Sequence, residues 1–485
     1  MEGEAEASIL SSDLAVTPGY VATEMVAAVP TEALAKIEVL IPARWSGQPK
    51  EIGRVIEFLA SDEVAFITGA TKASRVGNMW PNPKTEGINC MTQSNVVLCA
   101  PVRTAIGTYG GSLKDIPAPD LGAVVVTETL SRAKVVGGAI DAVVMGQVIQ
   151  AGAKMNPARQ AAIKAGIPAN VPAMTINRVC GSGAQAIATA AQEVILGFAR
   201  SAVAGGMENM DQSPYLMASG RWGYRMGDAQ IYDSMLRDGL NDAFCDQHSG
   251  WVTEDLISKF QVTRDAQDRW AFRTQQRFGA AQAAGKFDGE LTPVEVHRHK
   301  GPIVFQKDEH NRPDATLETL AKLKPAFRKD GTITAGNAPG LNSGAAAMIV
   351  AEEGWAEKNG VEPMARLVAF GVGAVEPGMF GLGPVPAVHQ ALERAGWKLA
   401  DIERAEINEA FAAIVLVIIR ELGLPEDIVN VEGGAIAHGH PIGATGAVLT
   451  TRLLHAMHRD GIRRGLVTLC IGGHQGVALA LEALH

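Results

Sequence analysis

The sequence is poor in several features that mark large classes of protein. Aromatic residues make up 5% of the chain whereas glycine occurs 53 times, a balance that favours closely packed helices and sheets over an aromatic-rich β-sandwich. Apolar runs stay short of the roughly 18 residues that a membrane span requires, and residues 1–6 are acidic where a signal peptide would be basic. We therefore expect a cytoplasmic protein without a membrane partner.

Paired cysteines and clusters of basic residues are missing too. The five cysteines are an odd number and are scattered without C-x-x-C spacing, so neither a disulfide framework nor a metal site is expected. A net charge of −9 argues against nucleic acid as the main partner. In contrast, 47% of the 485 residues are apolar, which is enough for large cores in about three domains.

One cysteine lies where a nucleophile is expected. Cys180 follows residues 171–179, which predict a strand, and precedes a stretch that predicts a helix. Backbone N–H groups and the helix dipole at such a turn favour the thiolate, and Gly181 and Gly183 leave room for a substrate. This stretch alone is equally compatible with a small buried thiol. The apolar residues at helical spacing are Ile187, Ala191, Val194, Ile195 and Phe198.

Strands and helices alternate from about residue 94 onward. Apolar runs at 96–98 and 142–146 predict strands and residues 120–129 predict a helix, so we expect a mixed sheet covered by helices. Residues 207–342 break this rhythm with glycine, proline, polar residues and amphipathic helices. An excursion of that length is usually a functional lid or a separate subdomain.

The last part of the chain repeats the first at weak but ordered similarity. The simplest explanation is two copies of one α/β unit, with a large insertion in the first copy. An active site between the copies would take part of its chemistry from each. Residues 138–144, 180–184 and 200–206 correspond in order and character to residues 400–406, 440–446 and 464–470.

The second copy contains three polar stretches without an evident packing role. Asn408 lies at the start of an apolar helix, His440 lies in a glycine-rich turn, and Cys470 ends a strand just before Gly472. Each stretch alone is compatible with a structural role. Together with Cys180 they supply a nucleophile, a base, a second thiol, an amide and unhindered N–H groups, which is an uncommon catalytic set.

Residues 1–92 differ in character from the rest. The motifs PGYVATEM at 18–25, FLASDE at 58–63 and FITG at 66–69 resemble the C-terminal third of a short-chain dehydrogenase, closest to the acetoacetyl-CoA reductases. The nucleotide-binding half of that family and its Ser, Tyr and Lys have no counterpart here. We therefore expect an N-terminal extension and linker, either a gene-fusion remnant or the result of a misplaced start codon, with Met91 as the native start.

Residues from about 96 to 484 resemble the thiolase family, in particular its biosynthetic branch. The resemblance lies in the ordered motifs VCGSGAQA, NEAFA, GHPIGATG and CIGGHQG. It implies the α/β thiolase fold, with two βαβαβαββ halves and a loop-domain insertion in the first half. The implied domains are N-terminal (93–209 plus 342–362), loop (210–341) and C-terminal (363–485), and the implied assembly is a homo-oligomer, either a tetramer or a dimer.

The resemblance implies an acetyl-CoA C-acetyltransferase that condenses two acetyl-CoA molecules by a ping-pong acyl-cysteine mechanism. CoA thioesters are then the substrates, and no cofactor is needed. Cys180 would carry the acyl group, His440 would be its base and Cys470 the second acid/base. Asn408 would hold a water that forms one oxyanion hole with His440, and the N–H groups of Cys180 and Gly472 would form the other.

The resemblance also implies a CoA path through the insertion. This sequence departs from the family pattern at five positions, which limits how far the family's residue roles apply to it. These residues are Pro339, Ser249, Phe380, His438 and His474. A bulky His474 in place of a glycine would crowd the second oxyanion hole or need a costly positive φ. The implied substrate-binding residues are Leu240, His248, Arg312, Thr319, Phe327, Ala335, Leu341, Ala410 and Phe411.

Two other functions fit the same motifs. One is a degradative 3-ketoacyl-CoA thiolase that prefers longer chains, with the same residues acting in the cleavage direction. The other is a non-catalytic thiolase-like protein that binds CoA or lipid. Retention of both cysteines together with His440 and Asn408 argues against the second.

Overall fold

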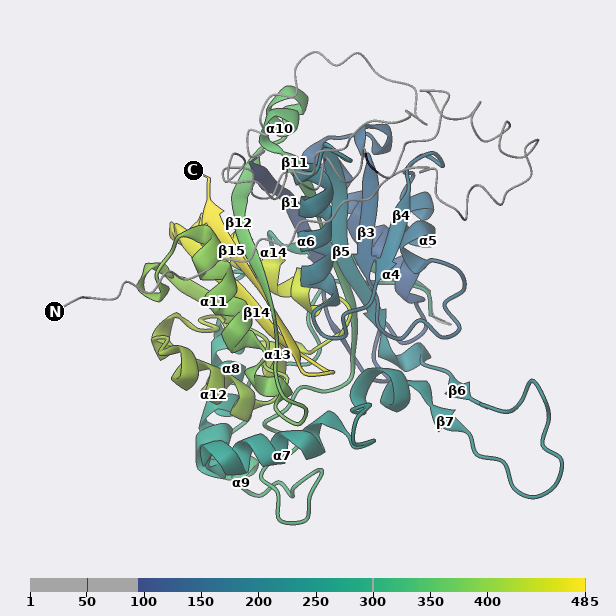
Figure 1. Ribbon diagram of the computed structural model, residues 1–485, viewed down its shortest axis with the longest axis vertical. Helices are drawn as coiled ribbons and strands as arrows, with labels where there is room; N and C mark the ends of the chain where they lie inside the picture. The colour runs from purple at the N-terminus through teal and green to yellow at the C-terminus, as the bar shows by residue number, and fades with distance from the viewer. Residues whose placement is uncertain (1–49, 51–94, 299–300, 485) are drawn as a thin grey trace. The chain divides into compact units, whose positions relative to one another are not determined.

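The computed structural model describes Lys50 and residues 95–298 and 301–484 (Figure 1). The expectations for the rest of residues 1–92 lie outside the described residues. The strands are β1 (Val96–Thr104), β2 (Gly107–Thr108), β3 (Ala142–Gly146), β4 (Ala173–Ile176), β5 (Ser201–Asn209), β6 (Tyr215–Leu216), β7 (Tyr232–Asp233), β8 (Leu291–Thr292), β9 (Val294–Val296), β10 (Ile303–Phe305), β11 (Asn342–Glu352), β12 (Pro363–Ala374), β13 (Arg404–Ile407), β14 (Arg464–Ile471) and β15 (Gln475–Ala483). The helices are α4 (Ala118–Ala133), α5 (Pro157–Lys164), α6 (Ser182–Ile195), α7 (Ser249–Phe260), α8 (Arg264–Ala283), α9 (Leu317–Ala321), α10 (Glu353–Asn359), α11 (Pro384–Ala395), α12 (Ala412–Leu422), α13 (Ala435–His438) and α14 (Thr445–Asp460).

Within the described residues, eleven strands form one mixed sheet made of two similar halves. Its main order is β13-β14-β15-β12-β1-β11-β5-β3-β4, with β2 and β8 attached at the side. The first half runs β1-α4-β3-α5-β4-α6-β5-β11, and the second runs β12-α11-β13-α12-α14-β14-β15. A single bridge from Ala405 to Val429 stands where the second half would have its third strand. The predicted repeat and mixed α/β fold are confirmed.

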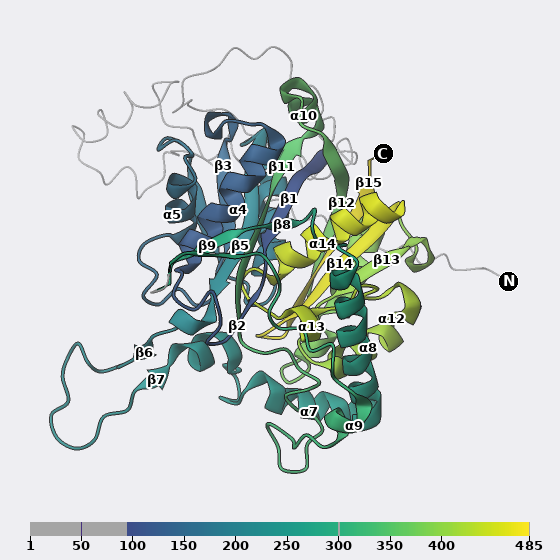
Figure 2. The ribbon, with the colours of Figure 1, turned by 180° about the vertical axis from the view of Figure 1, so that it is seen from behind.

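Three apolar clusters show how the layers pack. The central cluster combines α6 and α14 with strand residues of both halves. A second cluster covers the other face of the first half with α4 and α5, and a third covers the other face of the second half with α11 and α12. Figures 1 and 2 show these outer helices over their own strands. The helices α6 and α14 are therefore enclosed between the two halves.

The insertion lies between β5 and β11. It contains the pair β6 and β7, a π-helical turn at Met235–Leu240, and the helices α7, α8 and α9. Helix α8 packs beside α12, so the insertion covers part of the second half (Figure 2). At the corresponding place the second half has only a short turn between β14 and β15. The insertion and this turn are thus the main difference between the two copies.

The elements around Cys180 are shorter than the sequence predicts. The strand expected over 171–179 is confined to β4 because the chain turns at Val179, where φ is 43°. The helix α6 ends at Ile195, which is 40% exposed, and Phe198 beyond it is 82% exposed. Both side chains therefore lie outside the core, whereas Ile187, Ala191 and Val194 are buried.

The starts of α6 and α14 touch through glycines. A Cβ atom on Gly183 would lie 2.6 Å from the backbone nitrogen of Ala447, and one on Gly446 would clash with the backbone nitrogen of Ala184. Real side chains do not approach backbone atoms so closely. The two helix starts therefore meet backbone to backbone, which brings the preceding turns together.

Replacing Gly446 tests this contact. We expect Gly446→Ala to lower the free energy of unfolding by about 1–3 kcal/mol, because the new methyl group pushes α14 away from α6. Urea unfolding followed by circular dichroism measures the change. The matched control is Gly354→Ala in α10, where a Cβ atom would meet nothing within 4 Å, and where alanine favours the helix by roughly 0.5–1 kcal/mol. Equal stability of the two variants would contradict the backbone contact.

Candidate active site

Cys180 lies in the turn between β4 and α6. The hydroxyl of Ser182 accepts a hydrogen bond from the N–H of Arg178 at 2.9 Å and donates one to the carbonyl of Val179 at 2.7 Å, which fixes the turn. The backbone N–H of Cys180 and the N–H of Gly472 both donate toward the Cys180 thiol. Cys180 and Gly472 are thus brought together as the sequence predicts, although they come from opposite halves of the molecule.

Burial has the largest effect on the charge state of Cys180. Burial raises the pKa of its thiol to about 11, the two N–H donors offset only part of this effect, and the Glu208 carboxylate adds to the rise. The donors at the turn lower the pKa as the sequence predicts, but loss of water around the sulfur outweighs them. The thiol must lose its proton to a neighbouring base during reaction.

His440 lines the same cavity as Cys180 and is the candidate for such a base. It lies between α13 and α14, and its backbone N–H donates to the side chain of Asn342 at 2.8 Å. Its Nδ1 lies 2.6 Å from the hydroxyl of Thr445, which itself donates to the carbonyl of Pro441. The Thr445 oxygen can then only accept, so Nδ1 carries the ring proton and Nε2 carries the lone pair, toward which the Asn408 amide donates. Burial lowers the pKa of His440 to about 4, which keeps the ring neutral.

Asn408 and Cys470 are buried beside this pair. The amide nitrogen of Asn408 lies 3.4 Å from Nε2 of His440, and its Oδ1 has no partner among the described residues. Burial raises the pKa of Cys470 well above its ordinary value, and the proximity of Cys180 adds to the rise. Neither residue is among those that line the adjoining cavity. An unpaired buried amide oxygen is ready to bind a water or a substrate atom.

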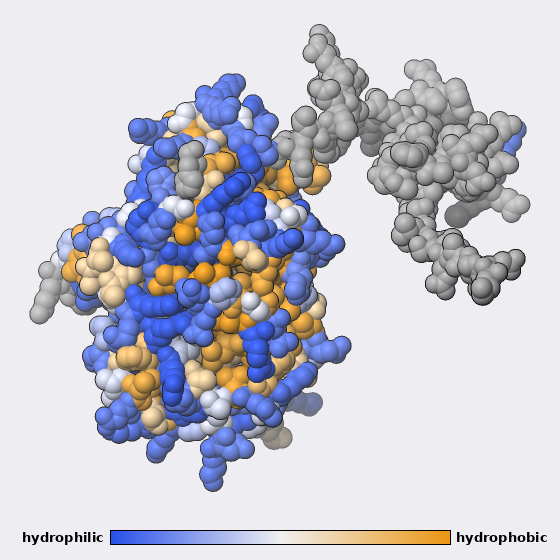
Figure 3. Space-filling model, turned by 90° about the vertical axis from the view of Figure 1, so that its left-hand side faces the viewer, coloured by the Kyte–Doolittle hydropathy of each residue, from blue (hydrophilic) through white to orange (hydrophobic). Residues whose placement is uncertain are grey.

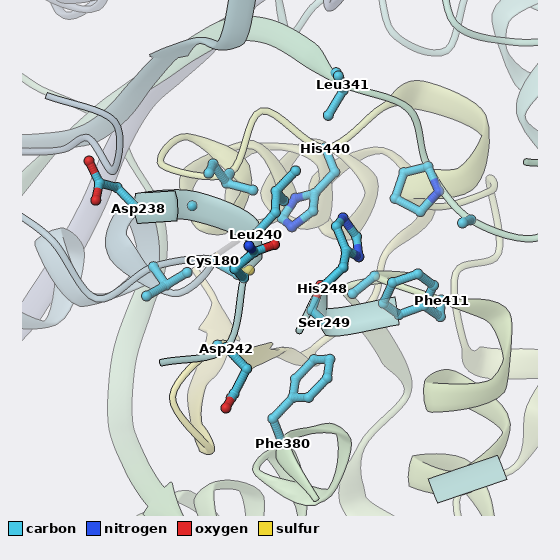
Figure 4. A pocket seen from close by; sticks show the side chains of 18 of the residues that line it. Cys180, Asp238, Leu240, Asp242, His248, Ser249, Leu341, Phe380, Phe411 and His440 are labelled. Atoms are coloured by element: carbon cyan, nitrogen blue, oxygen red, sulfur yellow. The ribbon is translucent and has the colours of Figure 1, made fainter. Parts of the chain in front are cut away.

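A cavity of about 390 Å³ adjoins Cys180 and His440 (Figure 4). Figure 4 shows Leu341 at one end and Asp242 and Phe380 toward the other. Six of the nine predicted substrate-binding residues line this cavity: Leu240, His248, Phe327, Leu341, Ala410 and Phe411. The other three, Arg312, Thr319 and Ala335, line a neighbouring cavity of about 240 Å³ that shares the residue Ala338 with the first.

His248 forms part of the cavity wall as a neutral ring. It stacks on Phe327 with 4.4 Å between ring centroids, and its Nδ1 accepts the N–H of Gly250 at 3.0 Å. Burial lowers its pKa to about 4. The wall that it shares with Phe411 is therefore uncharged and suited to an uncharged chain.

The departures noted in the sequence fall into two groups. Pro339, Ser249 and Phe380 line the cavity, whereas His438 is buried in the core with its ring 6.0 Å from that of Phe278. His474 adopts the positive φ, 65°, that the sequence suggested it would need. His440 rather than His438 faces the cavity, in agreement with the register set by the HPIG motif.

One buried carboxylate escaped the sequence analysis. Glu208 in β5 accepts the N–H groups of Val148 and Gly443 at 3.0 Å each, and that of Ile149 at 3.3 Å. It therefore links a loop of the first half to the turn that carries His440. Burial raises its pKa to about 7. The only signal in the sequence is an acidic residue inside an apolar strand.

Among Lys50 and residues 95–298 and 301–484, no three His, Cys, Asp or Glu residues are grouped in a way that could hold a metal ion. No helix in the same part of the chain has the length and apolar character needed to cross a membrane.

Family models match three parts of the chain. Residues 96–354 match the model described as Thiolase, N-terminal domain, and residues 361–483 match Thiolase, C-terminal domain. Residues 14–77 match Enoyl-(Acyl carrier protein) reductase, which confirms the predicted resemblance of this segment to the short-chain dehydrogenases.

Individual relatives agree with these models. An acetyl-CoA acetyltransferase of Pseudomonas aeruginosa is 50% identical over 388 residues, 80% of this chain and 99% of the relative. The Bacillus anthracis acetyl-CoA acetyltransferase structure has a TM-score of 0.80 and 43% identity, and the match covers 81% of this chain and 100% of that one. Human mitochondrial 3-ketoacyl-CoA thiolase in complex with CoA has a TM-score of 0.78 and 41% identity, over 81% and 98%. The chain belongs to the thiolase family.

Proposed function

We propose that the protein is an acetyl-CoA C-acetyltransferase that condenses two acetyl-CoA molecules to acetoacetyl-CoA and CoA, reversibly and without a cofactor. The observation that carries this proposal is the neutral His440, which has its ring proton on Nδ1 and lines the same cavity as the protonated Cys180 thiol. Relatives that are 50% identical over 99% of their length bear the same activity in their names. The domain division at 210–341 and the roles below are part of this proposal.

The first half-reaction acetylates Cys180. His440 takes the thiol proton as the sulfur attacks the carbonyl carbon of acetyl-CoA, and the N–H groups of Cys180 and Gly472 stabilise the oxyanion. The C–S bond to CoA then breaks, and the leaving CoA thiolate takes its proton from Cys470. The raised pKa of Cys470 keeps this proton in place in the free protein.

The second half-reaction forms the carbon–carbon bond. The Cys470 thiolate removes an α-proton from a second acetyl-CoA, and the enolate oxygen is held by protonated His440 and by a water bound to Asn408. The enolate carbon attacks the acetyl group on Cys180. Acetoacetyl-CoA leaves, and the Cys180 thiolate recovers its proton from His440, so all groups return to their starting states.

The CoA part of each substrate would extend through the two neighbouring cavities. Leu240, Leu341 and Phe411 offer apolar surface to the pantetheine, and Arg312 is the cation of the second cavity, where the nucleotide phosphates would lie. His248, Phe327, Ala410, Thr319 and Ala335 complete the two walls. The human thiolase in complex with CoA shares 41% of its residues with this chain, which supports this placement.

We also propose a homo-oligomer, either a tetramer or a dimer, in the cytoplasm. The arm between β6 and β7 projects from the body of the molecule (Figure 1), and Figure 3 shows apolar side chains exposed among hydrophilic ones on another face. Monomers rarely expose large apolar patches. The cysteines among the described residues are unpaired, as a reducing compartment requires. The exposed apolar residues of the arm are Tyr215, Met217, Trp222, Tyr224, Met226 and Ile231.

Mass spectrometry with acetyl-CoA tests the nucleophile. We expect one acetyl group to appear on Cys180 of the wild type and none on Cys180→Ala, together with loss of acetoacetyl-CoA thiolysis in the variant. Cys245→Ala is the matched control, because that cysteine is exposed and lies outside the cavity. Absence of an adduct on the wild-type protein would instead favour a CoA- or lipid-binding protein without turnover.

Replacing Thr445 tests the tautomer of His440. In Thr445→Val the Nδ1 proton loses its acceptor, which typically costs about 1–3 kcal/mol and should slow acetylation of Cys180 about 10- to 100-fold. Thr445→Ser keeps the hydroxyl and should acetylate at a rate close to that of the wild type. Rapid-quench single-turnover assays measure both rates. A valine variant as fast as the serine variant would exclude this role for Thr445.

The pH dependence of acetylation tests the protonation state of His440. Its lowered pKa of about 4 means that the base form persists as the pH falls, whereas a histidine of ordinary pKa 6.5 would be protonated. We expect single-turnover acetylation to continue from about pH 7 to about pH 5. The raised pKa of Glu208, about 7, places a second titration in this range, so Glu208→Gln is measured in parallel. A loss centred near pH 6.5 in both proteins would show that His440 has an ordinary pKa.

A further inference from the structure

His474 has an unusual position beside the proposed oxyanion hole. It lies in the turn between β14 and β15, two residues beyond Gly472, and its side chain is 3% exposed. Its φ of 65° and that of Gly473, 78°, place two consecutive residues in the left-handed region. A histidine there costs free energy that a glycine would not. Such strain persists where surrounding contacts hold the residue in place.

Those contacts join three segments of the chain. Nε2 of His474 lies 2.8 Å from Oδ2 of Asp242 in the insertion, and both side chains are buried. Nδ1 accepts the N–H of Gly378 at 3.2 Å, whereas Nε2, although close to the carboxylate, has no partner of hydrogen-bond geometry among the described residues. The ring also lies 5.3 Å from that of Phe244, and the backbone carbonyl accepts the N–H of Val375 at 2.9 Å.

Asp242 organises the loop that it belongs to. Its Oδ1 accepts the N–H groups of Phe244 at 2.9 Å and Cys245 at 3.2 Å, while its backbone N–H donates to Gln247 at 2.8 Å. Its other carboxylate oxygen is the one that faces His474. The shape of this loop and its attachment to the β14–β15 turn therefore depend on one carboxylate.

Each of the three segments contributes residues to the wall of the cavity beside Cys180. The loop contributes Asp242 and Ala243, the turn contributes Gly473, and the segment after Gly378 contributes Phe380. Figure 4 shows Asp242 and Phe380 away from the end marked by Leu341. The proposed nucleotide cavity adjoins the first through Ala338, three residues before Leu341. The wall segments that His474 joins therefore lie at the end of the cavity away from the proposed nucleotide cavity. The acyl chain of a bound substrate would lie at this end, which we call the acyl end.

We infer that the contact between Asp242 and His474 determines acyl-chain length, by closing the acyl end of the cavity so that short 3-ketoacyl chains are accepted and longer ones rejected. This inference rests on the proposed function. An alkyl chain longer than that of acetoacetyl-CoA would have to lie against a buried carboxylate or separate it from its partner, and both are unfavourable. Phe380 blocks the remaining space sterically.

Two single variants and their combination test the inference. His474→Gly removes the ring and relieves the positive φ, and Asp242→Asn removes the charge at nearly constant shape. For each protein, kcat and KM are measured for thiolysis of acetoacetyl-CoA, 3-ketohexanoyl-CoA and 3-ketooctanoyl-CoA. His297→Gly is the matched control, because His297 forms an exposed contact with Glu295 outside the cavity.

We expect the wild type and His297→Gly to prefer acetoacetyl-CoA in kcat/KM. Each single variant should reduce this preference over 3-ketooctanoyl-CoA at least tenfold, mainly through faster reaction of the longer substrate, and the double variant should add little because the two residues act as a pair. An unchanged chain-length profile in active variants, an equal loss on all substrates, or a wild type that prefers 3-ketooctanoyl-CoA would each overturn the inference. A wild type that cleaves no 3-ketoacyl-CoA would overturn the proposed function itself.

Discussion

The close contact between the starts of α6 and α14 is the constraint on which the site depends. Because Gly183 and Gly446 have no side chains, the two helices meet backbone to backbone. The turns before them carry Cys180 and His440, which therefore reach one cavity from opposite halves of the molecule. Glu208 strengthens this arrangement, since its carboxylate holds the His440 turn through Gly443 and a loop of the first half at the same time.

Burial at this junction sets the chemistry as well as the geometry. It keeps the Cys180 thiol protonated and the His440 ring neutral, so the site carries no charge on its proposed nucleophile or base before a substrate arrives. A charge that forms during reaction is then surrounded by fixed N–H donors rather than by water, and such donors act more strongly in a medium of low dielectric constant. The hydroxyl of Thr445 matters in this setting because it decides which ring nitrogen carries the proton and which carries the lone pair.

The sequence predicted what depends on local pattern and failed where distant contacts decide. Helical spacing and the repeat predicted the fold, and placed Cys180 and His440 at corresponding turns. The strand over 171–179 was predicted too long because the positive φ of Val179 is imposed by the Ser182 hydrogen bonds. The raised pKa of the Cys180 thiol was not predicted because depth of burial is not visible in a sequence. Glu208 is joined to Gly443 across 235 positions, and no periodicity reports such a pairing.

His474 lies where the two copies of one unit differ in structure. The insertion of the first half occupies the position that the β14–β15 turn occupies in the second half. The loop around Asp242, which belongs to the insertion, returns to contact that turn through His474. The insertion, which makes the two copies unequal, therefore also contacts the second copy. This contact lies in the same turn as Gly472, whose N–H faces Cys180. His474 thus has its positive φ where the fold's pseudo-symmetry breaks, and there it contacts both a segment of the cavity wall and the turn that carries Gly472.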